Sequence, residues 1–139
     1  MAYQQTSVRA YGILVRENRV VLVRATSRGA GAPVWWLPGG GLHFAETPEE
    51  ALTREFEEET GLLIAEPDLM NVLSDVRRRP NGDQIHSVRV IYRVRLVGGQ
   101  LRDEQEGSTD MARWFDVDAL NEVNLAEYTR QALSLVLAK

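Results

Sequence analysis

Hydrophobic residues alternate with polar ones along the first part of the chain, and this two-residue period predicts β-strands over 8–16 and 19–25. Between them stand Glu17 and Asn18, a polar pair of the length that closes a β-hairpin. A Gly-rich loop follows at 26–33. The chain therefore begins with a predicted hairpin and a loop.

The same period predicts a second pair of strands over 69–79 and 85–97. The residues between them, at 80–83, read Pro-Asn-Gly-Asp, which is strong turn chemistry. One face of the later strand is predicted to carry Val88, Val90, Tyr92, Val94 and Leu96, and the other Arg89, Arg93 and Arg95. A further short strand is predicted over 111–115.

A three-to-four-residue period takes over at 47–60 and predicts a helix. Thr47 suits the N-cap, and Glu50 completes a capping box with it. Pro48 fits the first helical position. Gly61 readily adopts the left-handed conformation that ends many helices, so the sequence predicts both ends of this helix.

A second helix is predicted over 124–138, where Asn124 and Glu127 resemble another capping box. In the first helix, Leu52 and Phe56 mark the buried stripe. The buried face of the second is predicted to carry Leu125, Tyr128, Ala132, Leu135 and Val136. These elements indicate one α/β (α+β) domain over 1–139, with a mixed sheet between helices.

Composition narrows the class of protein. The chain has 139 residues, a net charge of -4 and no cysteine, which excludes disulfide scaffolds and thiolate zinc sites. An acidic balance disfavours nucleic acid as a partner but allows a small anionic ligand held by a few arginines. No apolar run reaches the roughly eighteen residues that span a bilayer, so we expect a cytoplasmic protein without a membrane partner.

Three carboxylates share one face of the first predicted helix. Glu55, Glu58 and Glu59 stand at i, i+3 and i+4, and each like-charge pair costs about a few tenths of a kcal/mol. Arg54 offsets part of this repulsion. A hard cation such as Mg²⁺, or Mn²⁺, prefers such oxygens, whereas a solvated acidic surface is the common alternative for an isolated cluster.

The residues around Glu55, Glu58 and Glu59 decide between a metal site and a solvated acidic surface. The string G-x5-E-x7-R-E-F-x-E-E-x-G-L is formed by Gly40, Glu46, Arg54, Glu55, Phe56, Glu58, Glu59, Gly61 and Leu62. At average residue usage, a chance match at all nine positions is expected about once in a billion starting positions. An accidental cluster is therefore disfavoured.

This string resembles the Nudix box. The segments 36–40 (WLPGG) and 113–120 (RWFDVDAL) also resemble the entry loop and the downstream strand and helical turn of the Nudix hydrolase family. The resemblance implies an αβα sandwich and a divalent cofactor, usually Mg²⁺. It implies hydrolysis of a nucleoside diphosphate linked to another group. Because homodimers are common in the family, a homodimer is also a candidate oligomeric state.

The resemblance also implies residue roles. Glu55, Glu58 and Glu59 would hold the metal, and Gly39 would add a backbone carbonyl. Glu55 is the best candidate for the general base, and Arg54 orients the glutamates.

The sequence departs from the family at two positions. Ala45 stands where glycine is common, and a positive φ there would cost about a kcal/mol. Ala112 stands where many relatives carry an acidic residue, which leaves the downstream carboxylate open. Glu104, Glu106 and Asp110 are the candidates, and we favour Glu106.

Contacts to the rest of the substrate are less defined. The arginines that are candidates for its phosphates are Arg24, Arg28, Arg77 and Arg79, although strand arginines more often face solvent. Trp35 and Tyr11 are candidates for stacking on a base, with core packing as the favoured alternative for both.

Two classes of function follow. The first is an active hydrolase, for which ADP-ribose or a nucleotide sugar is the favoured substrate, and oxidised nucleoside triphosphates or diadenosine polyphosphates are the alternatives. The second is a non-catalytic, nucleotide-sensing module on the same fold. The intact glutamate trio favours the enzyme.

Overall fold

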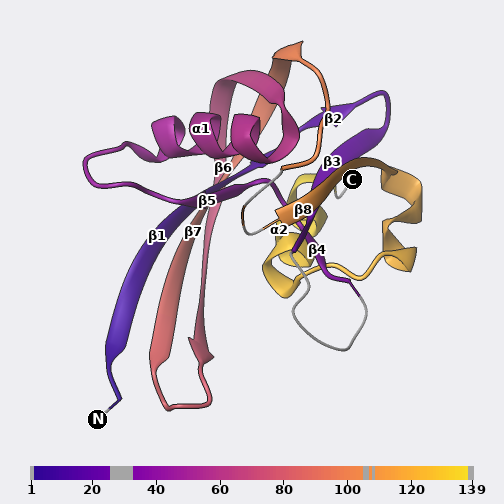
Figure 1. Ribbon diagram of the computed structural model, residues 1–139. Helices are drawn as coiled ribbons and strands as arrows, with labels where there is room; N and C mark the ends of the chain where they lie inside the picture. The colour runs from indigo at the N-terminus through magenta and orange to yellow at the C-terminus, as the bar shows by residue number, and fades with distance from the viewer. Residues whose placement is uncertain (1, 26–32, 105–106, 108, 138–139) are drawn as a thin grey trace.

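The computed structural model describes residues 2–25, 33–104, 107 and 109–137, and Figure 1 shows the arrangement of the elements. In chain order these are β1 (Gln4–Ile13), β2 (Val15–Arg16), β3 (Arg19–Ala25), β4 (Trp35–Trp36), β5 (Gly39–Gly41), α1 (Pro48–Thr60), β6 (Leu62–Arg78), β7 (Gln84–Gly99), β8 (Thr109–Asp116), the 3-10 helix η1 (Val117–Glu122) and α2 (Glu127–Leu137). Among these residues, neither α-helix combines the length and apolar character that a bilayer span requires.

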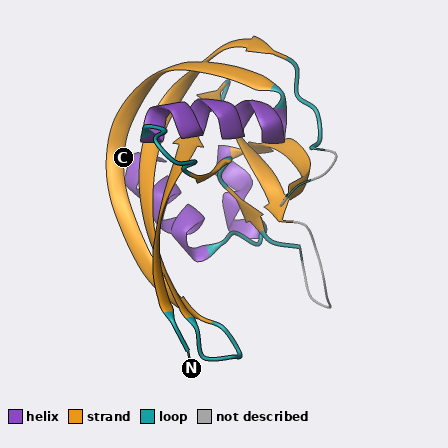
Figure 2. Ribbon diagram, turned by 60° about the vertical axis from the view of Figure 1, so that its left-hand side comes forward, coloured by secondary structure: helices purple, strands orange, loops and turns teal. Residues whose placement is uncertain are grey.

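The strands form two sheets. The first has the order β5-β1-β7-β6, in which β1 runs parallel to β7 and the other neighbours are antiparallel, so the predicted mixed sheet is confirmed. β1, β6 and β7 continue beyond the helices as a curved arm (Figures 1 and 2). In the second sheet β3 pairs with β2, β4 and β8.

Each α-helix covers its own hydrophobic cluster, and together the clusters make the αβα sandwich. Leu52 and Phe56 of α1 are fully buried in one cluster with Ala10 and Leu14. Residues of α2 pack in the other cluster, whose buried members include Tyr11, Ile13, Ile91, Tyr128, Ala132 and Leu133. Alternate residues of β1 therefore face α1 and α2.

The ends of α1 follow the predicted pattern. The Thr47 side chain accepts a hydrogen bond from the Glu50 amide, and the Glu50 side chain accepts one from the Thr47 amide. Gly61 closes the helix in the left-handed region, at φ 78°. The helix is thus fixed at both ends by its own sequence.

The predicted strand limits need correction. The strand predicted over 8–16 is divided into β1 and β2, and β1 begins earlier, at Gln4. The strand predicted from 69 begins at Leu62, because β6 passes Pro67 through an irregularity in its pairing with β7. Proline is tolerated there because β6 is an edge strand.

The predicted start of the last helix is also wrong. α2 begins at Glu127, and Asn124 does not cap it, since its side chain donates to the Pro33 carbonyl. The Trp35 amide donates a hydrogen bond to the Asn124 carbonyl, and the Ala126 amide donates one to the Trp35 carbonyl, which holds this segment beside β4. Leu135, predicted to be buried, is 56% exposed, and Leu133 occupies the core instead.

Ala45 has a φ of 71°, so the left-handed conformation suspected from the sequence is confirmed. We expect Ala45→Gly to raise the free energy of unfolding by about 0.5–1 kcal/mol, because relief of the Cβ clash exceeds the extra chain entropy of glycine. Urea unfolding at constant m-value measures the change. Ala65→Gly, at a position without positive φ, is the control and should lower stability; an Ala45→Gly variant no more stable than the parent would contradict the prediction.

Candidate functional site

The carboxylates of α1 approach the backbone of β5 because β5 consists of three glycines. A side chain at Gly40 would collide with Oε2 of Glu55. Gly39 adopts φ 148°, and a side chain there would collide with the Ala10 carbonyl. The Gly39 amide donates a hydrogen bond of 2.9 Å to Oε1 of Glu59. The glycine run therefore brings helix carboxylates against a bare strand.

Glu59 is a buried carboxylate, with 3% of its surface exposed. Burial raises its pKa well above the ordinary value, and the negative charges of Glu55 and Glu104 add to this effect. The amide of Gly39 and the charge of Arg9 lower the pKa in part. The protein alone therefore compensates a negative charge on Glu59 incompletely.

Glu55 lies beside Glu59 and is also removed from water, with 18% of its side chain exposed. Burial raises its pKa, although the ion pair with Arg54 at 2.8 Å opposes the shift. Oε1 of Glu55 accepts the hydrogen bond from Arg54, whereas Oε2 faces Gly40. One oxygen is fixed, and the other points toward the glycine strand.

Arg54 connects the loop before α1 to the carboxylate face. It donates two hydrogen bonds to Glu46, at 2.8 and 2.9 Å, and one to the Gly41 carbonyl, at 3.2 Å. These hydrogen bonds lower the pKa of Glu46 to about 2. Its contact with Glu58, four residues further along the helix, is longer, at 3.5 Å. Arg54 therefore holds Glu46, Glu55 and the end of β5 in one network.

The described residues contain no group of three or more acidic or histidine side chains already gathered closely enough to hold a metal ion. Glu58 is turned to solvent, with 47% of its side chain exposed. Mg²⁺ nevertheless binds through one or two carboxylates together with water and substrate phosphates. The carboxylates of half-buried Glu55 and buried Glu59, whose negative charge the protein compensates incompletely, fit such an ion.

The predicted substrate contacts are scattered. Arg24 makes a two-bond ion pair with Asp110, at 2.8 and 3.2 Å. Arg77 lies in the distal arm of β6, and Arg79 lies beyond the end of that strand, so the two do not belong to one strand. Arg28 lies outside the described residues.

Trp35, a candidate for stacking on a base, packs edge-to-face on Phe115, with ring centroids 4.7 Å apart. Glu106, favoured from the sequence, lies outside the described residues. Glu104 is close enough to raise the pKa of Glu59, and it accepts a hydrogen bond from Thr109 at 2.8 Å. Of the two candidates that the structure describes, Glu104 and Asp110, Glu104 is the one whose charge acts on Glu59.

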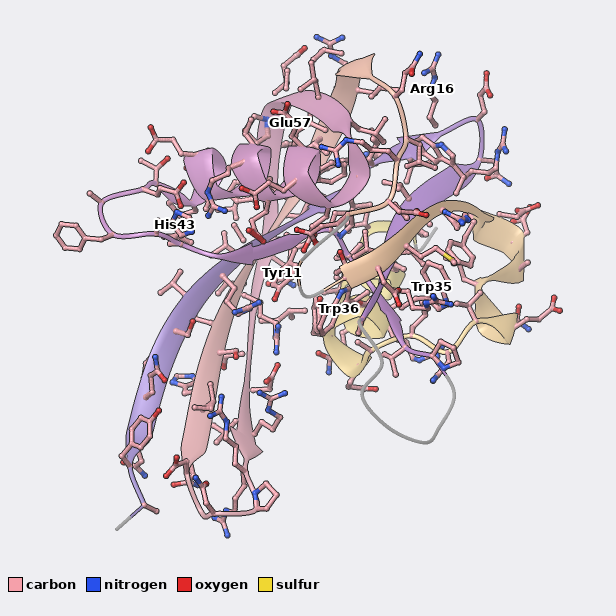
Figure 3. The ribbon with its side chains drawn as sticks, in the orientation of Figure 1. Tyr11, Arg16, Trp35, Trp36, His43 and Glu57 are labelled. Atoms are coloured by element: carbon pink, nitrogen blue, oxygen red, sulfur yellow. The ribbon has the colours of Figure 1, made fainter. Side chains whose placement is uncertain are left out.

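Two arginines were not considered as site residues from the sequence, and the charge of one of them, Arg9, acts on Glu59. Arg9 and Arg89 are neighbours across β1 and β7, and both donate to the hydroxyl of Tyr11. Figure 3 shows Tyr11 beneath α1, between the helix and Trp36, whereas Glu57 lies on the opposite side of α1. Only the parallel pairing of β1 with β7, which no local pattern predicts, brings these arginines together.

Comparison with known proteins agrees with this geometry. The family model described as NUDIX domain matches residues 4–136. The chain is similar to an ADP-ribose pyrophosphatase of Methanocaldococcus jannaschii, with 31% identity over 121 residues. The alignment covers 85% of this chain and 66% of that protein, just under two thirds of its length. It is 35% identical over 104 residues to an RNA pyrophosphohydrolase of Alkalilimnicola ehrlichii. That alignment covers 65% of this chain and 58% of that protein.

A solved structure shows the same fold along almost the whole chain. The crystal structure of a MutT NUDIX hydrolase from Burkholderia pseudomallei superimposes with a TM-score of 0.79 and 30% identity, covering 94% of this chain and 98% of that one. The glycine strand, the carboxylate helix and the match over residues 4–136 lead to one conclusion: the chain belongs to the NUDIX domain family.

Proposed function

We propose that this chain hydrolyses a phosphoanhydride bond in a nucleoside diphosphate linked to another group, and that ADP-ribose or a nucleotide sugar is the first substrate class to test. The observation that carries the proposal is the pair of carboxylates, half-buried Glu55 and buried Glu59, held against the bare backbone of β5. The similarity to an ADP-ribose pyrophosphatase supports the choice of substrate.

Glu55, Glu58 and Glu59 are the residues that would hold Mg²⁺ or Mn²⁺, with the carbonyl of Gly39 as a further ligand. A bound divalent ion neutralises charge on phosphate oxygens and lowers the pKa of a bound water. The protein itself supplies the position of these ligands. Arg54 fixes one oxygen of Glu55 and, through Glu46, anchors the loop that precedes α1.

Glu55 is the proposed general base and accepts a proton from the attacking water at Oε2, the oxygen that Arg54 leaves free. Its pKa is raised by burial, which makes the carboxylate a better proton acceptor than an exposed one. Arg54 keeps the side chain in place during this transfer. Glu104 is a second carboxylate near Glu59 and the alternative base.

A second substrate class has support from one relative. The similarity to an RNA pyrophosphohydrolase makes a 5′-triphosphate end a candidate, although the net charge of -4 favours a small nucleotide. The carboxylates would act on a phosphoanhydride in either case. The two classes differ in the group attached beyond the phosphates, so a substrate panel separates them.

The function is tested by turnover of a panel comprising ADP-ribose, a nucleotide sugar, diadenosine polyphosphates, an oxidised nucleoside triphosphate and a 5′-triphosphorylated oligonucleotide. We expect hydrolysis with Mg²⁺ or Mn²⁺, loss of at least about a hundredfold in rate with excess chelator, and recovery when metal is restored. Released nucleotide and phosphate are quantified by chromatography. Full turnover in chelator would contradict the assignment of the glutamates, and a folded protein inactive on the whole panel would favour the non-catalytic module.

A further inference from the structure

Two guanidinium groups from neighbouring strands converge on one hydroxyl. Nε of Arg9 donates to Oη of Tyr11 at 2.6 Å, and Nη1 of Arg89 donates to the same oxygen at 2.9 Å. The two arginines are paired in register between β1 and β7. Two positive charges are thus held side by side near the end of the glycine strand.

Arg89 is fixed and its charge is compensated. It makes two hydrogen bonds to Asp75, at 2.8 and 3.3 Å, and its guanidinium lies 4.1 Å from the ring centroid of Tyr128. Only 15% of its side chain is exposed. Arg89 therefore serves as a rigid support for the hydroxyl that also orients Arg9.

Arg9 has a different environment. None of the ion pairs among the residues that the structure describes involves Arg9, and its side chain is only partly buried. Its Nη1 lies 3.5 Å from the position that a Cβ of Gly41 would occupy. The backbone of β5, which carries no side chains, thus separates this cation from the side where Glu55 lies.

We propose that Arg9, oriented by the hydroxyl of Tyr11 and supported by Arg89, binds the substrate phosphate that faces away from Glu55 and Glu59. This inference rests on the proposed function, because it requires the diphosphate to lie at β5. Guanidinium groups match phosphate oxygens with paired, charge-assisted hydrogen bonds. Because they need no metal ion for this contact, a diphosphate should bind measurably in chelator.

The test uses two probes that cannot be hydrolysed, adenosine 5′-(α,β-methylene)diphosphate and methylenediphosphonate, with binding measured by calorimetry in excess chelator. Arg9→Gln should weaken both affinities by about tenfold to a hundredfold, the usual value of a charge-assisted hydrogen bond. Arg9→Lys keeps the charge and should lose less. Arg19→Gln, which removes an exposed arginine of β3, is the matched control and should change neither affinity.

Tyr11→Phe tests the positioning role separately. The ring keeps its packing on Tyr128, at 4.7 Å between centroids, but the hydroxyl that aligns both arginines is lost. We expect weaker binding of both probes with an unchanged melting temperature.

The outcomes separate this inference from the proposed function. Probe binding that depends on Arg9, in a protein that hydrolyses nothing in the panel, would support the phosphate site and reject the activity. Metal-dependent turnover combined with equal probe affinities for the parent, Arg9→Gln and Arg19→Gln would overturn the inference alone. No measurable binding of either probe to the parent protein in chelator would overturn it as well.

Discussion

Replacing Glu55 by glutamine is expected to lower kcat by about 10²–10⁴, the usual range for loss of a positioned acid–base group. Glutamine keeps the size of the side chain and its helix propensity, and it accepts the hydrogen bond from Arg54 at one oxygen. It removes the negative charge and the proton acceptor at the Oε2 position, which faces Gly40. Steady-state turnover of the best panel substrate measures the effect.

The same substitution should preserve or slightly raise stability. The raised pKa of Glu55 indicates that burial and the nearby Glu58 disfavour its charged form, so a neutral side chain is tolerated. Glu57→Gln is the matched control, because Glu57 is exposed and lies on the other side of α1 (Figure 3). Near-normal turnover of Glu55→Gln would remove Glu55 from the role of base and direct attention to Glu58, Glu59 or Glu104.

Replacing Phe56 by alanine should give the opposite result. The ring is fully buried against the sheet and lies in contact with the position of Gly12, where a Cβ would come within 3.0 Å of it. Removing a buried aromatic ring leaves a cavity and costs about 3–5 kcal/mol. We expect a melting temperature lower by on the order of 10 °C or more, with kcat retained below the transition.

Phe44→Ala is the control for Phe56→Ala, since it makes the same chemical change at a fully exposed ring. Its effect on the free energy of unfolding should stay within about 0.5 kcal/mol. Glu55 and Phe56 are adjacent in sequence but lie about 100° apart around the helix. A Phe56→Ala protein as stable as Phe44→Ala would show that the ring is not part of the core.

Local chemistry in the sequence was sufficient to predict the helix that carries the site. Thr47, Glu50 and Gly61 mark the ends of α1 through contacts between near neighbours, and these contacts are present in the structure. The positive φ of Ala45 follows from the same kind of local rule. The start of α2 could not be predicted in this way, because pairing with Trp35, far away in sequence, holds residues 124–126 out of the helix.

The substrate side of the site depends on contacts between distant parts of the chain. Arg9 and Arg89 read as ordinary strand arginines until β1 is paired with β7, and the ion pair of Arg24 with Asp110 requires β3 to lie beside β8. Period-two patterns identify the faces of strands but not which strands are neighbours. The motif therefore located the carboxylates, whereas the phosphate-binding candidates required the tertiary structure.

The central claim, that water cleaves a phosphoanhydride bond at this site, is tested most directly by hydrolysing ADP-ribose with Mg²⁺ in water enriched in ¹⁸O and analysing the products by mass spectrometry. We predict AMP and ribose 5-phosphate, with one heavy oxygen in the phosphate of one product and none in the adenosine part of AMP; the C1 oxygen of ribose 5-phosphate exchanges with water and is left out of the count. Glu55→Gln run in parallel should form the same products at the reduced rate. Products without heavy oxygen in either phosphate, or products that retain an intact diphosphate, would contradict the account.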